Sequence, residues 1–224
     1  RSDLLTDPWI TAFPDSSKLM ANRTTLLWPP RELYNLLWHL LANAPEGGAL
    51  FRHHCKDQFN LEWTPNGTVW PLPQELCINE SLQQSVFHAI TGPFMTQDRK
   101  RGTPHGWLTN HLEDGLRQVS PRSFLAALRE AASGDPLGTA YPLSGADIQR
   151  GVSKASEIRV QEIAEDYPWV TQLMTPLKGM VIPAPFQEMK ACWEKKKTLD
   201  QLKEAMDNDG VRQFPQRLEK EGAD

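Results

Sequence analysis

The amino-acid sequence predicts a mainly α-helical protein: a helical bundle with one β-hairpin and a helical tail that resembles a truncated winged helix. Most periodic stretches repeat apolar residues at intervals of three and four, as the buried face of a helix does. The 18 prolines and 14 glycines fall mostly between these stretches, where they begin or end helices. With 39% hydrophobic and 23% charged residues, the 224-residue chain has a globular composition and enough length to bury a core.

The first predicted helix follows Pro29 and Pro30. Proline suits the first helical turn, and Glu32 supplies the negative charge that this turn favours. Its apolar stripe consists of Leu33, Leu36, Leu37, Leu40 and Leu41. Three more helices are predicted before residue 135: one from Asn79 to Gly92, a short one around Trp107, and one after Ser120 and Pro121 that ends at Ser133 and Gly134.

A different pattern covers residues 59–73. Apolar residues flank a Pro65-Asn66-Gly67 turn, and Asn-Gly is a strong signal for a tight hairpin turn. The flanking apolar residues are Leu61, Trp63, Val69 and Trp70. Residues 59–73 are therefore predicted to form a β-hairpin.

Residues 136–143 are rich in glycine and proline, and they predict a linker between a helical part, 26–135, and a helical tail, 144–224. The tail is predicted to begin with a long helix over 145–166. Arg159 interrupts the apolar stripe of this helix, and we expect it to pair with a carboxylate across a helix interface.

The end of the tail carries two further helix starts. Thr198 is placed to cap one helix, and an amphipathic segment starts again at Phe214 after an Asn-Asp-Gly turn. Helix, turn and helix in this order predict the start of a winged helix whose later strands are missing. The sequence begins without a methionine and ends within a charged stretch, so we expect a longer polypeptide.

Charge and cysteine content exclude several classes of protein. A net charge of −4 argues against coating nucleic acid or anionic lipid by bulk charge. The longest apolar stretches fall short of a bilayer span, so no membrane segment is expected. Three cysteines at wide spacings form no disulfide framework, which favours a reducing, cytoplasmic location.

Catalytic motifs are absent from the sequence. A phosphate-binding loop needs a Gly-Lys dipeptide, and the chain has none, nor does it contain GxSxG or HExxH. We therefore expect no catalysis by these residues alone. The nearest approach to a metal cluster is His53, His54, Cys55 and Cys77, but adjacent histidines rarely face one ion, so no metal is expected. Trp63, Trp70 and Trp107 are either a stacking platform for bases or hairpin and core residues.

Two basic features are candidate phosphate contacts. Arg99, Lys100 and Arg101 form a basic loop that either contacts phosphate or nucleic acid or is simply solvated. Arg122 lies in the first turn of a capped helix, where its guanidinium can meet an anion together with free backbone N–H groups. The alternative for Arg122 is a surface arginine, or one paired with Glu113 or Asp114.

A set of short motifs spread over most of the chain resembles the junction and helical lid of bacterial STAND/KAP-like P-loop ATPases of the AAA-related class. The motifs are Arg1-Ser2-Asp3-Leu4-Leu5, Phe13-Pro14-Asp15, Leu27-Trp28, Glu32-Leu33-Tyr34, Arg101-Gly102, Trp107, Asn110-His111-Leu112, Asp114-Gly115, Ser120-Pro121-Arg122, Ser153-Lys154-Ala155-Ser156 and Glu165-Asp166-Tyr167-Pro168.

This resemblance implies a regulatory role. Residues 1–25 would end the ATPase core and connect it to a lid, 26–135, that closes over ATP. Arg122 occupies the place of the sensor-2 arginine, which reaches the γ-phosphate, and Arg1 and Asp3 would lie at the core edge. ATP and Mg²⁺ would be held by a core upstream of Arg1, because the Walker A loop and Walker B acids are absent. The hairpin at 59–73 is not part of a minimal lid.

The implied partner is the P-loop core of the same polypeptide, and a homo-oligomer or a protein partner stays open. A rival hypothesis is a helical module that binds nucleic acid or protein through the loop at 99–101, the tryptophan hairpin and the terminal helices. A third hypothesis is a free-standing metal enzyme, which stoichiometric zinc in the purified protein would support.

Overall fold

The computed structural model describes residues 27–96, 99–134, 140–181 and 184–209. The expected core-edge contacts, Arg1 and Asp3, and the whole predicted connector at 1–25 lie outside these residues.

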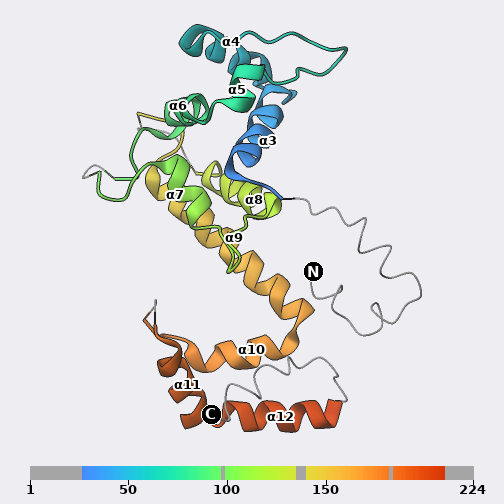
Figure 1. The fold of residues 1–224 in the computed structure, drawn as a ribbon, viewed down its shortest axis with the longest axis vertical. Helices are drawn as coiled ribbons and strands as arrows, with labels where there is room; N and C mark the ends of the chain where they lie inside the picture. Colours follow the sequence, from blue (N-terminus) through green and yellow to red (C-terminus); the bar gives the residue numbers. More distant parts are fainter. Residues whose placement is uncertain (1–26, 97–98, 135–139, 182–183, 210–224) are drawn as a thin grey trace. The chain divides into compact units, whose positions relative to one another are not determined.

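The described residues are mainly helical, as predicted (Figure 1). In chain order the helices are α3 (Pro30–Ala42), α4 (Gly48–Phe59), α5 (Gln74–Ile78), α6 (Glu80–Thr91), α7 (Pro104–Asn110), α8 (Pro121–Ala131), α9 (Gly145–Asp166), α10 (Pro168–Met174), the 3-10 turn η2 (Thr175–Leu177), α11 (Phe186–Lys195) and α12 (Thr198–Asp209).

Contacts divide the chain into two compact units, Arg1–Ala155 and Ser156–Asp224. The boundary lies within α9, not in the glycine- and proline-rich segment before it. The reason is that the first half of α9 buries Ile148, Val152 and Ala155 in the core of the first unit.

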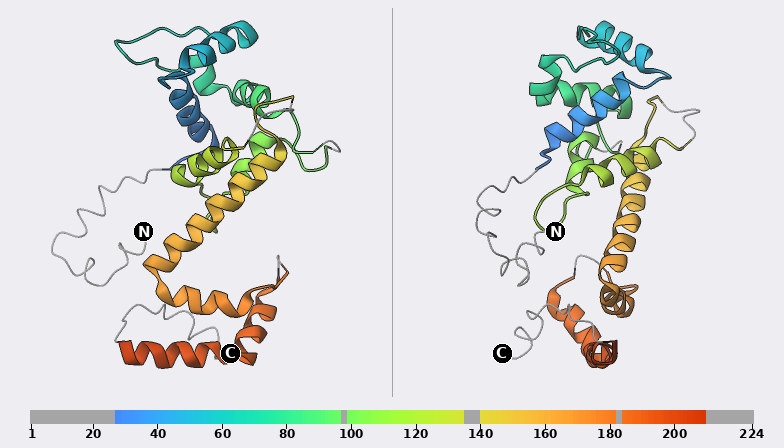
Figure 2. Two further views of the ribbon diagram at one scale, coloured as in Figure 1. Left: turned by 180° about the vertical axis from the view of Figure 1, so that it is seen from behind. Right: turned by 90° about the vertical axis from the view of Figure 1, so that its right-hand side faces the viewer.

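The core of the first unit is built around aromatic side chains from several helices. Tyr34 of α3 is fully buried, and its ring meets Phe87 of α6 and Phe124 of α8 edge-on, at centroid distances of 5.1 and 5.2 Å. Trp38, one turn along α3, is equally buried and stacks on Phe51 of α4. Figure 2 shows the two faces of this helical assembly, with α3 between α4 and α8. Such edge-on pairs fix the angles between helices more narrowly than aliphatic contacts do.

Local signals set most helix starts correctly. Pro30 and Pro121 begin α3 and α8, and the Asn79 side chain caps α6 by accepting a bond from Leu82 N at 3.1 Å. Ser120 has the extended backbone of a cap but makes no side-chain capping bond. Helices α4, α5 and α11 were not predicted. Helix α4 starts after Gly47, whose φ of +84° turns the chain, and its apolar periodicity is weak.

The predicted β-hairpin at 59–73 does not form: Phe59 ends α4, and residues 60–73 form a loop. One isolated antiparallel bridge joins Asn66 and Val69, and the described residues contain no strand. Pro65, Pro71 and Pro73 lack the N–H groups that a strand pair needs, so the ladder cannot extend from the turn.

An asparagine side chain holds this loop instead. Asn43 Oδ1 accepts a hydrogen bond from Trp70 N at 2.8 Å, and Asn43 Nδ2 donates to Trp70 O at 2.9 Å. The Arg52 guanidinium lies 4.0 Å from the centroid of the Trp70 ring and also donates to Ala42 O. The amide of Asn43 therefore takes the place of a neighbouring strand.

The second unit is held by bonds to the end of α10 and to η2. Trp193 of α11 donates its indole N–H to Leu173 O at 2.8 Å. Cys192 Sγ and Lys196 Nζ both donate to Pro176 O, at 3.2 and 2.9 Å. Helix α12 begins at Thr198, but the predicted cap does not form: Thr198 is the first helical residue, and its buried Oγ1 has no hydrogen-bond partner. Helix α11 was not predicted. The remainder of the expected winged helix falls on 210–224, outside the described residues.

Arg159 differs from its prediction. Its guanidinium is exposed and lies 3.5 Å from Glu162 on the same helix, one turn along, instead of pairing across a helix interface. An exposed position on a long helix lets a nearby carboxylate meet the arginine without burying either charge.

Candidate functional site

The start of α8 presents Arg122 from a firmly held helix. Phe124, Ala127, Leu128 and Ala131 bury one face of α8 in the core, while the side chain of Arg122 is exposed in the first turn. Because Pro121 has no N–H and Ser120 provides no side-chain cap, the first turn keeps backbone donors on its open end. An exposed basic side chain and a helix N-terminus therefore occur in the same turn, and helix N-termini favour anions.

The loop before α8 is shaped by Asp114. Its carboxylate accepts bonds from Leu116 N at 2.8 Å and from Gln118 N at 3.0 Å, and Asp114 N donates to Gln118 O. Arg117 within this turn has a φ of +57°, a backbone conformation that costs energy for a residue with a side chain. Arg117 and Arg122 are both exposed, and so are the carboxylates of Glu113 and Asp114, so the segment carries charges of both signs.

The far end of α8 is fixed by α9. Arg150 of α9 donates to Ala131 O at 3.0 Å, which caps the last turn of α8. Its guanidinium also contacts the Asp147 carboxylate at 2.7 Å. Hydrogen bonding from Ser144, with help from Arg150, lowers the pKa of Asp147 and keeps this carboxylate ionised. Helix α8 therefore holds its position from both its apolar face and its C-terminus.

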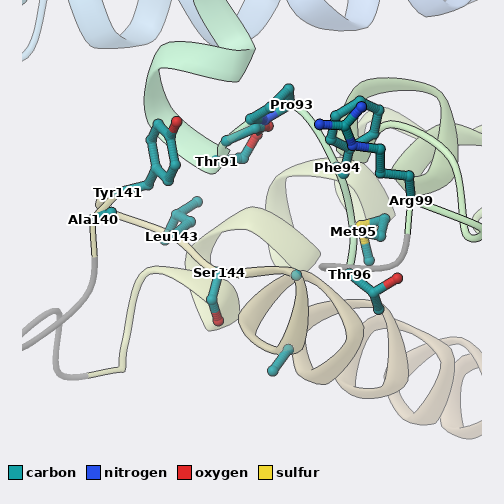
Figure 3. A pocket seen from close by; sticks show the side chains of 13 residues that line it. Thr91, Pro93, Phe94, Met95, Thr96, Arg99, Ala140, Tyr141, Leu143 and Ser144 are labelled. Carbon is teal, nitrogen blue, oxygen red and sulfur yellow. Dashed lines mark hydrogen bonds between the residues drawn. The ribbon is translucent and has the colours of Figure 1, made fainter.

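A second candidate site is a pocket of about 610 Å³ between the end of α6 and the start of α9. Figure 3 shows Tyr141 on one side of it and Phe94 with Arg99 on the other, with Leu143 and Ser144 between them. Tyr141 and Phe94 are 41% and 37% exposed, which leaves ring surface open to the pocket.

Two glycines in close contacts line this pocket: Gly92 lies against the Tyr141 ring, and Gly145 lies against the Met95 backbone. A Cβ added at Gly92 would stand 2.9 Å from Tyr141 Cε2, and one added at Gly145 would stand 2.0 Å from Met95 O. Leu143 N donates to Ile90 O at 3.0 Å, which ties the segment before α9 to the end of α6. Glycines at these two positions therefore let the segments approach closely enough to form one pocket.

The predicted basic loop lies at the rim of the pocket. Arg99, with a φ of +60°, places its guanidinium 4.9 Å from the centroid of the Phe94 ring. Lys100 and Arg101 follow it and are exposed. Met95 N donates to Gly102 O at 3.0 Å and closes the loop at its base. The structure thus brings the basic loop and two aromatic rings together, whereas Arg122 belongs to a different element.

Trp70 and Trp107 have different neighbours, and the histidines and cysteines considered as metal ligands do not form a cluster. Trp70 is held by Asn43 and Arg52, whereas Trp107 stacks on His111 at 3.8 Å. His53 and His54 are exposed while Cys55 is buried, and among the described residues no cluster of histidine, cysteine and acidic side chains could hold a metal ion.

Sequence reasoning did not find His88 and His105, two partly buried histidines. The His105 ring of α7 stacks on Tyr34 at 3.9 Å, and Tyr34 donates its hydroxyl to His105 O at 2.8 Å. His88 Nε2 and His105 Nε2 are both buried without a hydrogen-bond partner. Burial, followed by the charge of His88, lowers the pKa of His105 to about 4, so this imidazole is neutral near pH 7.

Comparisons with known proteins add no assignment: no family model, no curated protein and no solved structure matches this chain. None of the helices in the described part of the chain is both long and apolar enough to cross a bilayer.

Proposed function

We propose that this chain is the helical lid and tail of a P-loop ATPase of the STAND/KAP-like class, with Arg122 as the side chain that contacts the γ-phosphate of ATP. The observation that carries the proposal is the position of Arg122: an exposed arginine in the open first turn of a helix whose other face and C-terminus are fixed. The ATP and its Mg²⁺ would be held by a core outside these 224 residues, and that core would be the principal partner of the lid.

The proposed mechanism depends on a contact between Arg122 and the γ-phosphate that exists only when the lid is closed over ATP. A lid that closes over ATP gains a charge-assisted bond between Arg122 and the γ-phosphate, and it loses this bond when the phosphate leaves. ATP would therefore favour the closed lid and ADP the open lid. Arg117 would add positive charge beside the same helix start.

The first test is the intact mass of the polypeptide in its native cell. A mass well above 25.4 kDa, with a phosphate-binding loop in the added sequence, is the expected result. A mass near 25.4 kDa would leave no core for the lid to close on and would overturn the proposal.

The second test is Arg122→Ala in that longer polypeptide. We expect ATP affinity to fall roughly 10- to 100-fold, the equivalent of losing one hydrogen bond to a charged group, with ADP affinity nearly unchanged. Arg129→Ala is the matched control, because Arg129 is an exposed arginine in the last turn of the same helix. Equal ATP and ADP affinities in wild type and Arg122→Ala, with both variants folded, would refute the sensor role.

A further inference from the structure

We propose that the pocket between Phe94 and Tyr141, with the loop 99–101 at its rim, binds single-stranded nucleic acid: one base enters the pocket and the adjoining phosphates meet the basic loop. This inference uses residues on other elements than Arg122 and does not depend on the ATPase proposal.

The pocket suits an unpaired base. It has a volume of about 610 Å³ and holds two partly exposed aromatic rings, Phe94 and Tyr141, on opposite sides. Bases stack on such rings whatever their sequence, because every base has a π face. Bases in a duplex are already stacked and paired, so a pocket of this kind selects a single strand.

The charges around the pocket fit a phosphate backbone. Arg99, Lys100 and Arg101 are consecutive and exposed. The Arg99 guanidinium lies over the Phe94 ring, so a cation and an aromatic ring are in contact at the rim of the pocket. The nearest carboxylate at the start of α9, Asp147, is bonded to Ser144 and Arg150, so its charge is compensated locally. Asp98 precedes the three cations of the loop in the sequence, so residues 98–101 carry a net charge of +2, and a strand leaving the pocket along the loop meets positive charge.

A nucleic acid fits better than an acidic peptide for a geometric reason. The exposed cations of the loop can neutralise phosphates of a strand, and the aromatic pocket beside them accepts a flat, rigid group. An acidic peptide would use the cations and leave the aromatic rings without a role.

The experiment is fluorescence anisotropy with the 224-residue chain and a fluorescein-labelled 12-nucleotide single strand of mixed sequence. We expect binding at 50 mM salt that weakens as salt rises, with a slope of log affinity against log salt of about −2 for three phosphate contacts on a single strand. A blunt duplex of the same sequence and an acidic peptide of the same length should bind more weakly.

Two kinds of variant separate stacking from charge. Tyr141→Leu should weaken binding about 5- to 100-fold and leave the salt slope unchanged, whereas Tyr141→Phe keeps the ring and should bind as wild type. Arg101→Gln should make the slope of log affinity against log salt about 0.7 shallower, because it removes one phosphate contact. Two control variants should change neither the affinity nor the salt slope. They are Arg129→Gln, which removes a cation on α8, and Phe186→Ala, which removes an exposed ring of the second unit.

Several results would overturn the proposal. They are the absence of binding at 50 mM salt, equal affinity for the duplex or for the acidic peptide, equal affinity for a single nucleoside monophosphate, and wild-type binding by Tyr141→Leu. Phe94→Leu provides a second stacking variant if Tyr141→Leu changes the far-UV circular dichroism spectrum, and its wild-type binding would equally overturn the proposal.

Discussion

Gly151 of α9 packs directly against the backbone of Ala127 in α8. A Cβ built on Gly151 would stand 2.1 Å from Ala127 O and 3.3 Å from Ala131 Cβ, so only a hydrogen atom fits between the two helices. The neighbouring Arg150 donates to Ala131 O from the same turn of α9. The close approach and the capping bond therefore depend on one another.

Replacing Gly151 by alanine should push α9 away from α8. We expect Gly151→Ala to lower the free energy of unfolding by about 1–3 kcal/mol, because overpacking displaces backbone as well as side chains. Urea unfolding followed by circular dichroism measures this change.

Gly106→Ala is the matched control for this substitution. Gly106 is also helical, but the nearest atom to an added Cβ is Thr103 Oγ1 at an ordinary 3.7 Å. Alanine should therefore stabilise α7 by about 0.5–1 kcal/mol through its better helix propensity. Equal effects of the two substitutions would mean that α8 and α9 can separate at little cost.

Asn43→Ala should release the loop at 60–73. The substitution removes both bonds to the Trp70 backbone and leaves the Trp70 N–H without this partner, which should cost about 1–3 kcal/mol of stability. Hydrogen exchange at the Trp70 amide should become faster by a larger factor than exchange in α6. Asn110→Ala, which removes an exposed asparagine at the end of α7, should leave the Trp70 amide as slow as in wild type.

The partly buried imidazole of His105 should make the fold sensitive to acid. The folded protein lowers the pKa of His105 from 6.5 to about 4, chiefly through burial. The unfolded chain therefore binds the proton first, and the free energy of unfolding should fall as pH decreases from about 6.5 to about 4. His88, whose pKa burial also lowers, adds to the same trend.

Denaturation midpoints at pH 7.5, 6, 5 and 4.5 measure this dependence. His105→Phe keeps a ring against Tyr34 but cannot take up a proton, so its stability should vary less with pH over this range. His54→Gln, at an exposed position, should retain the wild-type dependence. A His105→Phe profile parallel to that of wild type would assign the acid sensitivity to other groups.

Cys55 should resist alkylation in the folded protein. It is fully buried, and burial raises the pKa of its thiol to about 12, so the reactive thiolate is scarce. Iodoacetamide at pH 8, followed by peptide mass spectrometry, should leave Cys55 unmodified for longer than Cys192, which is half-buried. In urea the two should react at similar rates, and early labelling of Cys55 in buffer would show that α4 opens readily.

Helix starts were predictable because their signals are local. Pro30 and Pro121 act through their fixed φ angles, and Asn79 acts through a side-chain cap. Each works within one turn of its own position, and α3, α8 and α6 begin at or beside these residues. The basic loop and the exposed first turn carrying Arg122 were likewise visible in the sequence, because charge and a proline-led helix start need no distant partner.

The aromatic pocket and the missing hairpin depended on residues far apart in the chain. Phe94 and Tyr141 line one pocket because Gly92 leaves room for the Tyr141 ring and Gly145 leaves room for the Met95 backbone, and neither ring has a periodic pattern of its own. The Asn-Gly turn forms only one bridge, Asn66 to Val69, because the nearby prolines cannot donate the hydrogen bonds of a longer ladder. The Trp70 backbone instead bonds to the side chain of Asn43, which is 27 positions away in the sequence.

The sequence by itself thus determined that this protein is helical, where most helices begin, and which cations lie on exposed turns. Tertiary structure placed Arg99 against the Phe94 ring and divided α9 between the two units. It also made residues 60–73 a loop. Local rules act through backbone sterics and capping within a turn, whereas contacts between distant segments are chosen by the packing of the whole core.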